Sequence, residues 1–83
     1  MTNVTVALPD EIFSSVRRSP DEVANEMRLA LAIRWYSQGL ISQGKGAEIA
    51  SLSRADFMRA LSDAGVSPFQ ETIDDIRETL SRG

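Results

Sequence analysis

The chain of 83 residues contains no cysteine and no histidine. Their absence excludes disulfides, thiolate nucleophiles, imidazole bases and the usual zinc sites. No glycine-rich loop follows a strand-like segment, as a phosphate-binding loop would require, and the carboxylates fall at predicted helix starts and on polar faces. We therefore expect a protein that is not an enzyme and that uses no metal ion and no cofactor.

An excess of basic charge is also missing. Nine Lys and Arg residues against twelve Asp and Glu residues give a net charge of −3, which argues against binding to nucleic acid by bulk charge. Residues 1–65 hold seven basic and eight acidic side chains, whereas residues 66–83 hold two basic and four acidic ones. The acidic surplus therefore lies mainly at the C-terminal end.

Long apolar runs are absent as well. No stretch approaches the length that crosses a bilayer, and the N-terminal residues lack the basic, apolar and cleavage regions of a signal peptide. We expect a cytoplasmic protein with no membrane partner. A single domain over residues 1–83, with 42% apolar residues, fits a folded chain. A chain this short buries only about 60% of its unfolded surface, so a partner subunit would help to stabilise it.

Residues 42–65, SQGKGAEIASLSRADFMRALSDAG, predict a helix-turn-helix. The unit needs a small residue where its two helices approach, here Ala47, and apolar side chains that fill the angle, here Leu52 and Phe57. The turn position usually held by a left-handed glycine is Ser51, at a cost of about 1 kcal/mol or more.

The second helix of this unit has clear boundary signals. Ser53 is a capping residue with Asp56 as its capping-box partner, and Gly65 ends the helix. Exposed arginines early in this helix are placed to contact a guanine edge or a phosphate, and the start of the first helix is placed to hold a phosphate. The predicted DNA-binding residues are Gln43, Lys45, Ser53, Arg54, Met58 and Arg59. The alternative is a helical hairpin without a nucleic-acid role, acting as a protein-interaction module.

The first forty residues predict a strand and two helices. Residues 2–8 alternate, with Val4, Val6 and Leu8 on one face, which is typical of a half-buried β-strand that pairs with another segment or with its copy. Residues 9–16 predict a short helix. A longer central helix over residues 20–38 follows, with Ser19 as its cap.

The central helix carries apolar side chains around most of its circumference, more than one buried face requires. It is either wrapped by its own domain or, as we favour, part of a homodimer interface anchored by aromatic residues. The predicted interface residues are Val4, Val6, Leu31, Trp35 and Tyr36. A second mode of DNA binding stays open, because a strand, a short helix and a longer helix resemble a ribbon-helix-helix, with Asn3 and Thr5 in the major groove.

Residues 66–83 form an acidic tail that predicts a final amphipathic helix, with a narrow apolar stripe. A helix of this length is marginal alone, so it docks on the core or folds on a partner. The predicted partner-binding residues are Phe69, Ile73, Asp74, Asp75, Ile76 and Leu80.

The order of these motifs resembles uncharacterised protein family 0175, a family of small prokaryotic proteins regarded as antitoxins. The matching stretches are VALPDEI, SPDEVANEMRLALAIRWYSQGLIS, GKGAEIASLSRADFMRAL and GVSP. The resemblance implies a cognate toxin, often a nuclease of the PIN-domain type, and repression of the protein's own operon by binding its operator DNA.

The sequence as a whole predicts a mainly α fold, dimeric, in which a helix-turn-helix domain accompanies a long central helix and a short N-terminal β-strand. Residues 1–40 would supply the strand and the dimerisation helices, residues 41–65 the helix-turn-helix and residues 66–83 the acidic tail helix. The predicted function is an antitoxin-like DNA-binding transcriptional regulator that also neutralises a toxin.

Overall fold

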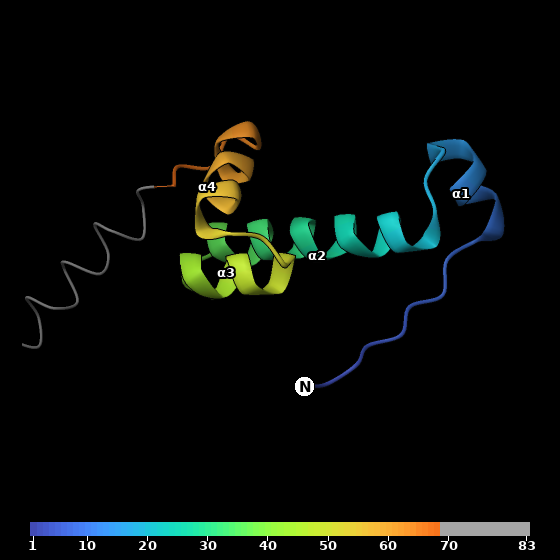
Figure 1. Ribbon diagram of the computed structural model, residues 1–83, viewed down its shortest axis with the longest axis horizontal. Coiled ribbons are helices and arrows are strands. Elements are labelled where there is room, and N and C mark those ends of the chain that lie inside the picture. Colours follow the sequence, from blue (N-terminus) through green and yellow to red (C-terminus); the bar gives the residue numbers. More distant parts are fainter. Residues whose placement is uncertain (69–83) are drawn as a thin grey trace, which may run out of the picture.

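The computed structural model describes residues 1–68. This part of the chain holds four α-helices and no strand, which confirms a mainly α fold. The helices are α1 (Asp10–Val16), α2 (Pro20–Ser37), α3 (Gln43–Ala50) and α4 (Arg54–Asp63). In Figure 1, α3 lies beside one end of α2, α4 rises at a steep angle near that same end, and α1 lies at the opposite end of α2. The predicted partner-binding residues Phe69, Ile73, Asp74, Asp75, Ile76 and Leu80 fall outside the described residues.

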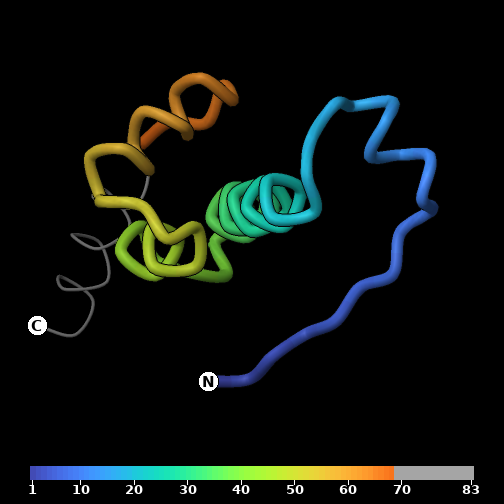
Figure 2. The backbone as a smooth tube through the Cα atoms, turned by 45° about the vertical axis from the view of Figure 1, so that its right-hand side comes forward, coloured from blue at the N-terminus to red at the C-terminus, as the bar shows by residue number. Residues whose placement is uncertain are grey.

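The predicted N-terminal β-strand is wrong. Residues 1–9 have no regular secondary structure, and Val4 and Val6 are 83% and 54% exposed. Figure 2 shows this segment as an extended tube that lies apart from α2, α3 and α4. Alternation of apolar and polar residues supplies no hydrogen-bond partner, and the described residues offer no second strand to complete a ladder. The ribbon-helix-helix alternative required this strand, so it is rejected together with the strand.

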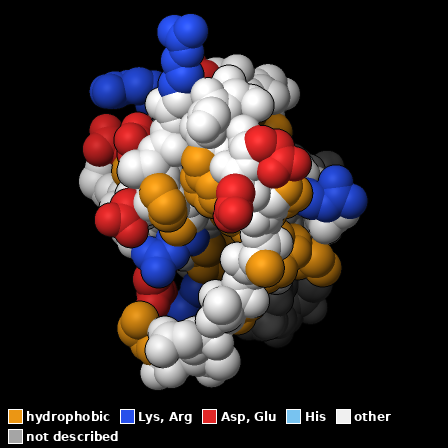
Figure 3. Space-filling model, turned by 90° about the vertical axis from the view of Figure 1, so that its right-hand side faces the viewer, with side chains coloured by type: hydrophobic (Ala, Val, Ile, Leu, Met, Phe, Trp, Pro, Cys, Tyr) orange, Lys and Arg blue, Asp and Glu red, His pale blue; other side chains and the backbone are white. Residues whose placement is uncertain are grey.

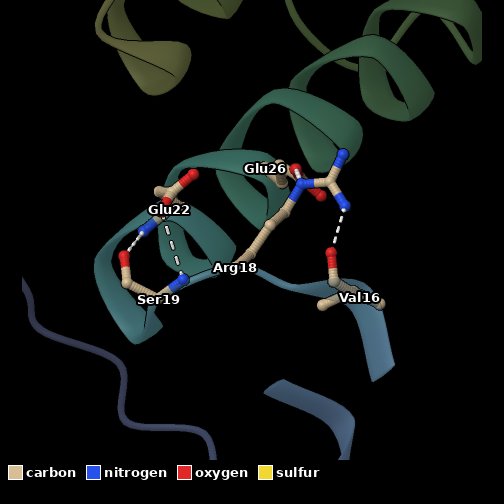
Figure 4. Close-up of polar contacts among 5 residues, drawn as sticks. All are labelled: Val16, Arg18, Ser19, Glu22 and Glu26. Carbon is tan, nitrogen blue, oxygen red and sulfur yellow. Dashed lines mark hydrogen bonds and ion pairs between the residues drawn. The ribbon is translucent and has the colours of Figure 1, made fainter. Parts of the chain in front are cut away.

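The start of α2 is fixed by local contacts that the sequence predicted (Figure 4). The Ser19 hydroxyl accepts a hydrogen bond from the Glu22 backbone at 3.2 Å, and the Glu22 carboxylate accepts one from the Ser19 backbone at 3.2 Å. Arg18 donates to the Val16 carbonyl at the end of α1, at 3.0 Å, and pairs with Glu26 on α2. Arg18 therefore links the end of α1 to α2 across the connection between the two helices.

The other helix ends follow the same local chemistry. Gly39 and Gly65 adopt left-handed backbone angles just after α2 and α4, with φ of 75° and 78°, as expected for terminating glycines. Ser42 and Ser53 cap α3 and α4, and each hydroxyl accepts from a backbone N–H three residues on, at 3.0 and 3.1 Å. These boundaries therefore need no long-range contact to explain them.

The core lies where α2, α3 and α4 meet. Phe57 and Leu61 of α4 are fully buried, and the ring of Tyr36 packs edge to face on Phe57 with centroids 6.2 Å apart at 83°. Buried Ala32, Ala47 and Ala50 complete the cluster. Tyr36 is only 4% exposed, so it is a core residue of its own chain and not the exposed dimer anchor that we predicted.

Candidate nucleic-acid interface

The packing of α3 against α4 depends on a glycine. A Cβ atom built at Gly46 would lie 2.5 Å from Cζ and 2.6 Å from Cε2 of Phe57. Ala47, which we predicted at the close approach, is buried, but the tightest contact lies one residue earlier. A glycine in a helix interior costs up to about 1 kcal/mol relative to alanine. Its presence at position 46 was therefore the feature of the sequence that could have indicated a close helix contact.

The turn between the two helices has the predicted left-handed residue. Ser51 adopts φ 57° and ψ 39° without the benefit of glycine. The next N–H, of Leu52, donates to the Ala47 carbonyl at 2.9 Å and closes the end of α3. Leu52 itself remains exposed, so it does not fill the angle between the helices as predicted. That space is taken by Phe57.

Four of the six predicted DNA-binding residues lie at the N-cap and in the first turns of α4. Because Phe57 and Leu61 point into the core, the opposite side of α4 faces solvent. The N-cap Ser53, Arg54 and Arg59 are exposed. Met58 is half-buried. The start of α4 is thus an accessible surface with arginine side chains.

Two of the predicted cations are paired with carboxylates on their own helices. Lys45 Nζ lies 3.0 Å from the Glu48 carboxylate, and an Arg59 guanidinium nitrogen lies 3.8 Å from the Asp56 carboxylate. Asp56 therefore faces Arg59, and the part of the chain described shows no return contact from it to the Ser53 backbone. Both pairs are exposed, where ion pairs contribute only about 0–1 kcal/mol and exchange readily with other partners.

Arg54 differs from these two. Its Nε donates to the side-chain oxygen of Gln43 at 2.9 Å, and within residues 1–68 no carboxylate pairs with it. Gln43, the first residue of α3, is 4% exposed, and its amide nitrogen donates to the Pro68 carbonyl at 2.6 Å. The predicted phosphate contact by the Gln43 side chain is therefore corrected, because that side chain is turned inward. Local patterns could not reveal this pair, since the two residues are brought together by the turn.

The predicted dimer residues that are not in the core lie in two places. Leu31 is 40% exposed, as is Met27 one helical turn earlier, on the side of α2 opposite Ala32 and Tyr36. Trp35 is half-buried. Val4 and Val6 lie in the extended N-terminal segment. Figure 3, which views the α1 end of the molecule, shows hydrophobic side chains exposed among acidic ones.

Across residues 1–68, no three acidic side chains gather as ligands for a metal ion. None of the helices described is both long and apolar enough to span a membrane.

Comparison with known proteins relates the chain to one family. The sequence pattern of the Uncharacterised protein family (UPF0175) matches residues 1–82. A UPF0175 protein of Aeropyrum pernix is 33% identical over 70 residues, which cover 84% of this chain and 78% of that protein. No solved structure matches the chain. The family resemblance noted from the motifs is confirmed.

Proposed function

This chain belongs to the Uncharacterised protein family (UPF0175), and we propose that it is a DNA-binding regulator whose α4 enters the major groove of operator DNA. One observation carries the proposal. The helix α4 is anchored on one side by fully buried Phe57 and Leu61, while Arg54 at its start and Arg59 on its outer side are exposed. A recognition helix needs this combination of a rigid inner face and an accessible start.

The chemistry of Arg54 supports base recognition. The guanidinium group carries two terminal nitrogens that match the O6 and N7 acceptors of guanine, and such a bidentate pair discriminates against other bases by about 1–3 kcal/mol. Arg54 is the first residue of α4, where side chains of a recognition helix meet base edges. Arg59, five residues further along, is suited to a phosphate once it leaves Asp56.

The charge balance limits how such binding works. The three cations of residues 43–65 are matched by three carboxylates, namely Lys45, Arg54 and Arg59 against Glu48, Asp56 and Asp63. Attraction to the phosphate backbone is therefore weak, and recognition rests on a few direct contacts. If a dimer uses two arginines per copy, the slope of log K against log salt is no steeper than about −4.

Operator binding by a small helix-turn-helix protein normally requires two copies, and α2 offers a surface for the second. Met27 and Leu31 are large apolar side chains left exposed on the side of α2 opposite the core. The first turn of α2 is acidic, Arg28 lies at its middle and Arg34 lies in its last turn. Two α2 helices packed antiparallel would therefore bring opposite charges together beside an apolar centre. We assign the homodimer contact to this surface.

Neutralisation of a toxin protein is the second part of the proposal, and it is supported by sequence alone. Residues 69–83 carry an acidic surplus and apolar residues at helical spacing. A basic partner, such as a nuclease, is the complementary surface for such a segment.

A different function is favoured by one observation. Because Lys45 and Arg59 are paired with carboxylates, the helix-turn-helix also suits a protein-interaction module in which the unit serves packing only.

The experiment that separates the two functions is fluorescence-anisotropy binding of the protein to DNA from upstream of its gene, over a salt series. The wild type is compared with an Arg54→Ala, Arg59→Ala double variant. Arg17→Ala, an arginine outside the unit, is the control.

Sequence-preferring binding that the double variant loses and the control retains would support the regulator. Binding that survives in the double variant would place the DNA contact elsewhere on the chain. If no binding exceeds the level seen with unrelated DNA, the interaction module is the better account.

A further inference from the structure

We infer that Gln43 is a positioning residue, which orients Arg54 for recognition of guanine without touching DNA itself. The inference rests on the proposed function, because it names how the same surface gains its specificity. It starts from a buried polar side chain that joins the beginnings of α3 and α4.

The Gln43 amide is held at both ends. Its oxygen accepts from Arg54 Nε at 2.9 Å, and its nitrogen donates to the Pro68 carbonyl at 2.6 Å. Since an arginine only donates and a carbonyl only accepts, just one orientation of the amide satisfies both partners. The side chain is 4% exposed, so water competes little for either bond. Gln43 is therefore a rigid acceptor pointed at the first residue of α4.

This contact uses the part of Arg54 that base recognition does not need. With Nε occupied by Gln43, both terminal nitrogens of the guanidinium remain without a partner in the described residues. Those nitrogens form the pair that fits guanine O6 and N7. Because a free arginine side chain loses considerable rotamer entropy on binding, fixing it beforehand raises its affinity for the base.

The neutral charge of Gln43 matters as much as its position. Lys45 and Arg59 contact carboxylates, which offset their charge, whereas Arg54 is held by an amide and keeps its full positive charge. A glutamate at this position would also accept from Nε, but it would compete with guanine for the same guanidinium. The amide thus orients the arginine while leaving its charge available.

A double-mutant cycle on the full chain tests this role. Gln43→Met replaces the amide with an apolar side chain of similar length. We expect operator affinity to fall about five- to tenfold in the wild-type background, and affinity for scrambled DNA to stay constant. In an Arg54→Ala background, the same substitution should have no further effect on operator binding. Equal losses in both backgrounds would show that Gln43 acts independently of Arg54 and would overturn the inference.

A second measurement does not depend on DNA. The ¹⁵N NMR signal of the Arg54 Nε–H should be protected from solvent exchange in the wild type and unprotected in Gln43→Met. Gln43→Glu, checked for folding by circular dichroism, should keep this protection yet bind the operator more weakly than the wild type. Operator affinity of Gln43→Glu equal to or above that of the wild type would contradict the argument from charge.

The two readouts separate the inference from the proposed function. If the wild type prefers the operator but Gln43→Met leaves the Nε–H protection unchanged, the positioning role fails and the regulator stands. If the protection depends on Gln43 but the wild type shows no operator preference, the proposed function is wrong, and so is the role of Gln43 in recognition.

Discussion

Gly46 lies directly against the ring of Phe57, so that a Cβ atom at position 46 would be 2.5 Å from Cζ of that ring. The contact brings α3 onto α4 at a place where a side chain on α3 would separate them. Phe57 is fully buried and cannot swing away without losing its contact with Tyr36. The geometry of the candidate recognition helix therefore depends on the absence of a methyl group.

Gly46→Ala should lower the free energy of unfolding by about 1–3 kcal/mol, because the added methyl overpacks the core. The matched control is Gly44→Ala in the same helix, where a Cβ meets no atom within 4 Å. That control should raise stability by up to about 1 kcal/mol through helix propensity. Urea denaturation of both variants gives the comparison, and equal effects of the two alanines would contradict the close approach.

Ser51→Gly should raise stability by about 0.5–1 kcal/mol. The serine is held at φ 57°, a backbone conformation that strains a residue with a side chain. Glycine removes this strain, and the gain exceeds the extra conformational entropy that a glycine loses on folding. Ser62→Gly inside α4 is the control and should lower stability by a few tenths of a kcal/mol up to about 1 kcal/mol. Thermal denaturation should move the midpoints of the two variants in opposite directions. A lower midpoint for Ser51→Gly would refute the strain.

Phe57→Ala should cost about 3 kcal/mol or more, because it opens a cavity where α2, α3 and α4 meet. The neighbouring Met58 is half-buried, so Met58→Ala is expected to cost less than half as much. Chemical denaturation measures both. A loss below about 1 kcal/mol for Phe57→Ala would remove the packing argument for the helix-turn-helix.

Leu31→Asp should convert the proposed dimer to a monomer, because it places a charge in the centre of the apolar stripe on α2. Leu40→Asp is the matched control, since Leu40 is an exposed leucine in the connection after α2 and lies off that stripe. Analytical ultracentrifugation at several concentrations gives the oligomeric state. Dimers that persist in Leu31→Asp would move the interface to another surface.

Deletion of residues 70–83 should abolish binding of the proposed toxin partner and leave the proposed dimer intact. The truncated chain keeps Pro68, whose carbonyl holds Gln43, so operator binding should also survive. Sedimentation measures the oligomeric state of the truncated chain, and pull-down with a candidate toxin measures partner binding. Monomers in the truncated chain would assign dimerisation, at least in part, to the deleted segment.

Helix ends were predictable and the strand was not, because their hydrogen-bond partners lie at different distances along the chain. Caps at Ser19 and Ser53 and terminating glycines at Gly39 and Gly65 were predictable, since each is satisfied by backbone groups within a few residues. The N-terminal strand was not, because a strand is completed only by hydrogen bonds to another segment. Alternation around Val4 and Val6 could describe a strand but could not supply its partner.

The sequence by itself determined where the helices begin and end, the left-handed turn at Ser51 and the membership of the family, because these depend on local backbone chemistry and on motif order. Only the tertiary structure decided that Tyr36 is buried, that Gly46 rather than Ala47 makes the close approach, and that Gln43 turns inward to hold Arg54. Those contacts join residues on different helices. Their partners are set by how the helices pack, and no local pattern encodes them.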